Sequence, residues 1–157
     1  MWNKYKSLFI ILLLTYFISL PAGIISGQSV NNWYENIIRP NFSPPNWLFG
    51  PVWTFLYALM SYAAWNAWRL CNDEKTKKTI LTIYFFHLLV SATWSFVFFG
   101  LQQIFFSIFI VFLIIIFIII LMKIYWNISK ISMFLMMPYI LWCCFALFLN
   151  FSIWRLN

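Results

Sequence analysis

The longest apolar run in the sequence extends from Ile104 to Ile124 and consists almost entirely of Ile, Phe, Leu and Val, with Ser107 as its polar residue before Lys123. A helix rises about 1.5 Å per residue, so about 20 such residues cross the ~30 Å hydrocarbon core of a bilayer. The run therefore predicts a transmembrane helix. Because it has no polar face, we expect it to face lipid.

The composition extends this conclusion to the whole chain. Only 8% of the residues are charged and 64% are hydrophobic, whereas soluble domains have about 25% charged residues. The net charge of +7 comes from Lys and Arg in short gaps between apolar runs, which is a topology signal rather than a nucleic-acid site. We predict an integral membrane protein with no nucleic-acid partner.

The residues with ionisable side chains leave little room for acid-base or metal chemistry. One His and three acidic residues do not provide a carboxylate pair or a zinc site, and we expect no metal and no required cofactor. Of the cysteines, Cys71 lies in a polar loop, and adjacent Cys143 and Cys144 point to diverging faces of an apolar run. No disulfide or metal framework follows from them.

Runs of span length recur along the chain. We predict an all-α membrane protein, a bundle of five transmembrane helices in one domain over residues 1–157, with spans at about 7–25, 44–68, 79–99, 104–124 and 131–154. Residues 26–43, here called the lid loop, are polar but carry apolar anchors, which predicts an ordered loop. The tight link at Gln102 and Gln103 makes the third and fourth spans antiparallel neighbours.

The apolar N-terminal run fits either a retained transmembrane helix or a cleaved signal peptide. A basic start before Leu8–Ile25 also fits a cleaved signal peptide, but the run is long enough to span and we expect it to be retained. Eight Lys and Arg lie on the side of the N-terminus and two on the other side. By the positive-inside rule the N-terminus is cytoplasmic, and the lid loop and the C-terminus are outside.

Aromatic side chains follow helical spacing on the second span. Pro44, Pro45 and Pro51 allow a helix to start but not to continue from upstream. After them an aromatic stripe recurs on one face. Its members are Trp53, Tyr57, Ser61, Ala64 and Trp68.

The third and fifth spans offer matching faces at the same depth. On the fifth span, Trp142, Ala146 and Asn150 recur every four residues, and on the third, His87, Ser91 and Trp94 share a face. By helical rise the tryptophans at 53, 94 and 142 all fall in the outer half of the membrane. These faces together predict an aromatic, weakly polar cavity beneath the lid loop.

Each of these residues also has a plainer interpretation. Trp and Tyr commonly form belts at the membrane interface. His87 in an apolar helix is more often a packing residue than an iron ligand, and Ser91 fits a helix contact. Arg39 is either an exposed charge or the partner of a ligand carboxylate.

The segment WYENIIRPNFSPPNWLFGPVWTFLYALMSY, together with TWSFVFFG and PYILWCCFALFLNFSIWRLN, resembles the tryptophan-rich sensory protein/translocator protein family over nearly the whole chain. The resemblance implies a five-helix bundle, usually a homodimer, with an interior pocket under the loop between the first two helices. Family members are associated with porphyrins such as protoporphyrin IX and haem, with sterols, and with benzodiazepine-type ligands. Some bacterial members promote light-dependent porphyrin breakdown through two tryptophans, which match Trp53 and Trp142 here; a small ligand-lining residue matches Ala146.

The sequence departs from the family pattern at several positions. Phe42 stands where Trp is common, Ser91 replaces a frequent Asn, and His87 stands where many members have Gln. The sterol motif needs a Tyr where this chain has Phe151 before Arg155. We therefore do not predict cholesterol as the natural ligand.

Residue pattern and resemblance lead to one main hypothesis and two alternatives. The main one is a receptor or sensor in the bacterial cytoplasmic membrane that binds a porphyrin and takes part in tetrapyrrole handling or stress signalling. The alternatives are a light-dependent porphyrin-degrading enzyme that uses Trp53 and Trp142, and a porphyrin transporter. The expected ligand-binding residues are Trp33, Arg39, Trp53, Tyr57, His87, Ser91, Trp94, Trp142, Ala146 and Asn150.

Overall fold

The computed structural model describes residues 2–157, with side chains from Tyr5 onward, and every regular element in that range is a helix. Four segments are long and apolar enough to cross a membrane: Tyr5–Val30, Glu74–Gly100, Ile104–Trp126 and Lys130–Leu156. The prediction of an all-α membrane protein is confirmed.

The expected second span is occupied by a less apolar helix. A short 3-10 helix, η1 (Asn46–Leu48), leads into α3 (Phe49–Leu70), which is not among the four apolar segments because its Gly, Pro, Trp and Asn residues lower its hydropathy. The helix begins at Phe49 rather than at the predicted position 44. Pro45 is held in an extended conformation (φ −63°, ψ 145°), so helical geometry starts only after it.

The first helix is longer than predicted and the lid loop correspondingly shorter. Helix α1 (Trp2–Val30) continues through Pro21, so the loop starts after Val30 instead of at residue 26. The Ser26 hydroxyl donates to the Ala22 carbonyl (2.8 Å), a local bond that suits a helix turn following a proline. Within the loop lies the single-turn helix α2 (Trp33–Asn36).

The third and fourth spans are antiparallel neighbours, as predicted. Helix α4 (Glu74–Ser95) ends in a π-helical turn, η2 (Phe96–Gly100), and α5 (Ile104–Trp126) packs against it. Gln102 closes the link with a φ of 58°. The expectation that α5 faces lipid holds for one side only, because Ile114, Ile118 and Leu121 are buried against α4 and α7.

The predicted fifth span is two helices. Helix α6 (Lys130–Leu135) ends at Met136, and α7 (Met137–Leu156) starts there with Pro138 in its first turn. Proline cannot donate the backbone hydrogen bond that would continue α6, but it fits the first turn of a new helix.

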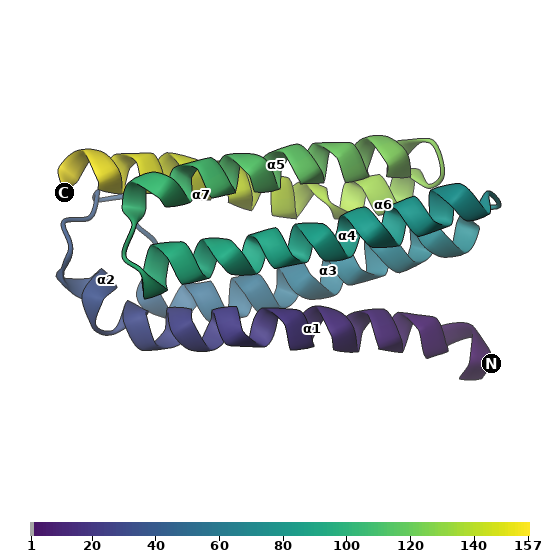
Figure 1. The fold of residues 1–157 in the computed structure, drawn as a ribbon, viewed down its shortest axis with the longest axis horizontal. Coiled ribbons are helices and arrows are strands. Elements are labelled where there is room, and N and C mark those ends of the chain that lie inside the picture. The colour runs from purple at the N-terminus through teal and green to yellow at the C-terminus, as the bar shows by residue number, and fades with distance from the viewer. Residues whose placement is uncertain (1) are drawn as a thin grey trace.

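The long helices form a closed bundle with the chain ends at opposite ends of it (Figure 1). Helix α1 contacts α3 and α4, and α5 contacts α4 and α7, while α3 contacts α6. The loop with α2 lies at the same end as the C-terminus. Asn157 connects the two, since its amide donates to the Ile38 carbonyl (3.0 Å) and accepts from the Ile38 N–H (3.1 Å).

Candidate functional site

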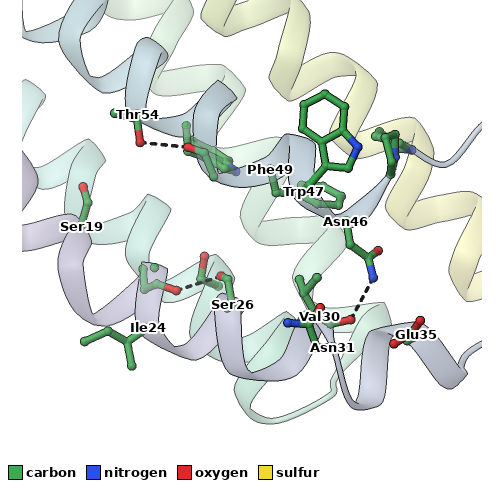
Figure 2. Close-up of a pocket in the computed structure, with 18 of the residues that line it drawn as sticks. Ser19, Ile24, Ser26, Val30, Asn31, Glu35, Asn46, Trp47, Phe49 and Thr54 are labelled. Atoms are coloured by element: carbon green, nitrogen blue, oxygen red, sulfur yellow. Dashed lines mark hydrogen bonds between the residues drawn. The ribbon is translucent and has the colours of Figure 1, made fainter.

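A large cleft opens between α1, the lid loop and the start of α3. Its volume is about 1300 Å³, and Trp53 and Tyr57 of α3 form part of its wall. Figure 2 shows Ser19 and Val30 of α1 on one side and Phe49 and Thr54 of α3 on the other. Pockets for drug-sized ligands measure roughly 300–1,000 Å³, so the cleft has room for a large flat ligand.

Small residues of α1 create this space. Ser19, Gly23 and Gly27 recur every four residues and all line the cleft. A Cβ added at either glycine would meet nothing within 4 Å. The α1 wall of the cleft is therefore open because these positions carry little or no side chain.

Polar groups of the lid loop and of η1 line the cleft. The Arg39 guanidinium donates to the Asn46 side-chain carbonyl (2.9 Å) and lies 5.0 Å from the centre of the Tyr34 ring. Asn46 in turn donates to the Val30 carbonyl (3.3 Å), which fastens the loop to the end of α1. Burial raises the pKa of Tyr34, and the neighbouring positive charge of Arg39 opposes this rise. Arg39 is half-buried, so its charge is available to an anionic group in the cleft.

A second, much smaller void lies on the inner side of Trp53. It measures about 20 Å³, enough for about one water molecule. Five of the predicted site residues line it: Trp53, Trp94, Trp142, Ala146 and Asn150. The predicted convergence of three helices on one depth is therefore present, but the space between them is nearly filled.

Aromatic rings account for this filling. The Trp53 ring centre lies 6.3 Å from that of Trp94, and Trp142 lies 6.3 Å from Phe49. Phe49 and Trp53 line both the void and the cleft, so these two side chains form the partition between them. The Trp94 indole N–H is buried and makes no hydrogen bond with any residue that the structure describes.

Three predicted residues lie elsewhere. Trp33 packs edge-on against Phe98 (5.5 Å), and His87 is fully buried with its Nε2 2.8 Å from the Tyr139 hydroxyl. Ser91 is buried on the same helix. Among the described residues that line the cleft or the void, none of these three is included.

Several lining residues were not predicted from the sequence. Asn46 and Trp47 come from η1, Phe49 is the first residue of α3, and Gly23 and Gly27 belong to α1. The four-residue spacing of Ser19, Gly23 and Gly27 was a readable signal, because small residues at that spacing mark close approach or open space on a helix.

The chain is thus an all-α membrane protein with an aromatic cleft beneath the lid loop. A model of the TspO/MBR family matches residues 9–155. The tryptophan-rich protein TspO of Archaeoglobus fulgidus is 36% identical over 142 residues, covering 89% of this chain and 90% of that protein. Protein CrtK of Rhodobacter capsulatus is 30% identical (90% of each chain), and the human translocator protein 29% identical (80% of this chain, 75% of that protein).

These matches extend over nearly the whole bundle, including the lid loop and α3. The chain belongs to the TspO/MBR family.

Proposed function

We propose that this protein is an integral membrane receptor or sensor that binds porphyrins, such as protoporphyrin IX or haem, in the cleft between α1, the lid loop and α3. The observation that carries the proposal is the 1300 Å³ cleft with Trp53, Tyr57 and Phe49 in its wall. A flat macrocycle would gain affinity from ring contacts and apolar burial there. Its propionates would reach Arg39.

Titration of the intrinsic fluorescence with protoporphyrin IX in detergent micelles tests this. Trp53→Ala should raise the Kd about tenfold, a loss of about 1.4 kcal/mol. Trp126→Ala is the matched control, because Trp126 is exposed on α5, far along the chain from the cleft residues. Equal affinity of the Trp53 variant and the wild type would refute binding against this wall.

The Trp142→Ala variant reports how deep the ligand goes. Trp142 lines only the small void, so it would contact a porphyrin in the cleft only if the Phe49 and Trp53 partition moved aside. A rise in Kd as large as that of Trp53→Ala would indicate that the ligand occupies the interior, between Trp53, Trp94 and Trp142. In that case His87, Ser91, Ala146 and Asn150 would surround it.

A second candidate is light-dependent breakdown of the bound porphyrin, favoured by the indole of Trp53 at the cleft wall with Trp94 at 6.3 Å behind it. An indole beside a photoexcited porphyrin can donate an electron and so start oxidative ring opening. Illumination of the complex should produce a new absorbing species that is lost in Trp53→Phe. Bleaching at the rate of free porphyrin would instead favour binding alone.

The membrane arrangement that goes with this function has α3 as a fifth span in a single transmembrane domain. Its 22 residues run alongside α1 and α4, and its one basic residue in the last turn, Arg69, matches an interfacial end. We place the protein in a bacterial cytoplasmic membrane as a homodimer, with the N-terminus cytoplasmic. A reporter fused after Asn157 should be active outside the cytoplasm; activity only inside would refute this orientation.

A further inference from the structure

Behind the cleft wall, a histidine and a tyrosine form a buried polar pair. His87 of α4 and Tyr139 of α7 are both fully buried, and the His87 Nε2 lies 2.8 Å from the Tyr139 hydroxyl oxygen. His87 is the one histidine in the sequence. Tyr139 is therefore the one tyrosine that can share its proton with an imidazole.

The groups around the imidazole assign the donor. The His87 Nδ1 makes no hydrogen bond of good geometry with any described residue, but the Tyr84 backbone carbonyl lies close to the imidazole. If Nε2 carried the proton, the Nδ1 lone pair would face this carbonyl, and the Tyr139 O–H would have to turn to Ser91. If Nδ1 carries it, the carbonyl can accept from the Nδ1–H, and the Tyr139 O–H donates to Nε2. The second arrangement avoids placing a lone pair beside a carbonyl, so the phenol donates to the imidazole.

The same phenol ring touches the cleft wall. The Trp53 and Tyr139 ring centres lie 6.2 Å apart, edge to face, and Trp53 also lines the cleft. The order from the cleft inward is thus indole, phenol, imidazole. Adjacent rings at this distance allow fast electron transfer between them.

We propose that Tyr139 and His87 form a proton-coupled electron donor that reduces Trp53 after Trp53 has lost an electron. In this step one electron passes from Tyr139 to the Trp53 radical cation, and the phenolic proton passes to the His87 Nε2. The products are a neutral indole, a neutral tyrosyl radical and an imidazolium. The oxidant in the protein's own setting is a photoexcited porphyrin, which takes one electron from Trp53; that part rests on the proposed contact between the ligand and Trp53.

Burial is what makes the imidazole necessary. A phenol that loses an electron becomes strongly acidic, and because both side chains are fully buried its proton passes to a neighbouring protein group. Tyr57 also contacts Trp53 (5.5 Å), but the one histidine is paired with Tyr139, so Tyr57 has no imidazole to take its proton. The Trp53 radical cation is therefore reduced by Tyr139 rather than by Tyr57, and the tyrosyl radical forms on Tyr139.

A flash experiment without porphyrin tests the relay directly. An ultraviolet laser flash ejects electrons from indoles, and electron paramagnetic resonance with transient absorption separates tryptophanyl from tyrosyl radicals. The part of the tyrosyl signal that disappears in Trp53→Phe reports on Trp53. We expect Tyr139→Phe to remove that part, and His87→Gln to slow its formation at least tenfold because the amide is not a base.

Two matched variants complete the test. Tyr57→Phe and Tyr125→Phe each remove a tyrosine hydroxyl with no imidazole partner, and both should leave the Trp53-dependent tyrosyl signal unchanged. Persistence of that signal in Tyr139→Phe, or unchanged kinetics in His87→Gln, would overturn the relay. In a parallel arm with protoporphyrin IX and visible light, failure of the ligand to bind would overturn the proposed function, while the porphyrin-free flash still decides the relay.

Discussion

The Tyr84 hydroxyl of α4 lies 2.8 Å from the Thr15 hydroxyl of α1, deep in the bundle where both side chains are fully buried. Ser61 of α3 joins them, with its hydroxyl 3.0 Å from each of the two oxygens. Three helices are thus linked at one level by a cluster of hydroxyl groups. Tyr125 provides a contrast, because its equally buried hydroxyl makes no hydrogen bond with any described residue.

Replacing Tyr84 should destabilise the protein, whereas replacing Tyr125 should not. Tyr84→Phe removes two interhelical hydrogen bonds and should lower the free energy of unfolding by about 1 kcal/mol, the scale found for such bonds in membrane proteins. Tyr125→Phe removes an unpaired buried hydroxyl and should leave that free energy unchanged or raise it slightly. Unfolding in mixed micelles measures both. An equal loss in the two variants would contradict the assignment.

Arg39 should distinguish porphyrins by their carboxylates. Arg39→Gln should raise the Kd for protoporphyrin IX about tenfold, because a charge-assisted hydrogen bond contributes roughly 1.5–3 kcal/mol and partial exposure reduces this. The dimethyl ester of the same porphyrin, which has no carboxylate, should bind wild type and variant equally well. A parallel loss for acid and ester would mean that Arg39 acts through the lid loop rather than on the ligand.

The start of α4 should give the protein an acid-sensitive element. Asp73 accepts hydrogen bonds from the Thr76 hydroxyl (2.6 Å) and backbone N–H (2.8 Å), which hold its pKa below the ordinary value of 3.8. A lowered folded-state pKa means that the stabilisation is fully present above about pH 3.8 and is lost as the pH falls through the folded value.

Asp73→Asn isolates this effect, since asparagine also caps helices but does not titrate in this range. The unfolding temperatures of wild type and variant should differ by a constant amount above pH 3.8. Below that pH the wild type should lose stability relative to the variant, because the Asp73 carboxylate becomes protonated. Curves that stay parallel throughout the acid range would show that Asp73 contributes no pH dependence.

Asn66 should be the main polar link at the N-terminal end of the bundle. Its amide donates to the hydroxyls of Ser129 and Ser132 (3.0 Å each), and its carbonyl accepts from Arg69 (3.2 Å). Asn66→Ala should lower the free energy of unfolding by about 2 kcal/mol, because it leaves the buried Ser132 hydroxyl without a donor and removes one of the two donors to Ser129. Asn127→Ala is the control, as its exposed amide makes a single 3.4 Å bond within its own helix turn; a similar loss in both would contradict this role.

The positions of the predicted spans followed from local features of the chain. Runs without charge become helices in a membrane because every backbone polar group must be paired internally, and this depends on the segment alone. The ends were less accurate where a proline was involved. The first span is predicted to end at residue 25, but α1 passes Pro21 and continues to Val30, whereas Pro138 divides the fifth span into α6 and α7.

The residues of the candidate site were predicted in part. Helical spacing placed Trp94, Trp142, Ala146 and Asn150 around Trp53, as the structure has them. Spacing also grouped His87 with them, but its imidazole pairs with Tyr139 instead. Periodicity identifies the face of a helix, while the partner on that face depends on how neighbouring helices are rotated.

The sequence by itself determined that this chain is a helical membrane protein of the TspO/MBR family and that Trp53, Trp94 and Trp142 belong to one group, since hydropathy, charge and spacing are properties of single segments. Only the tertiary structure decided that the large cleft lies between Trp53 and α1 and not between Trp53, Trp94 and Trp142. The rings of Phe49, Trp94 and Trp142 fill the interior, while the glycines of α1 leave the cleft open. Free volume depends on how side chains of different helices fit together, and a linear pattern does not contain that information.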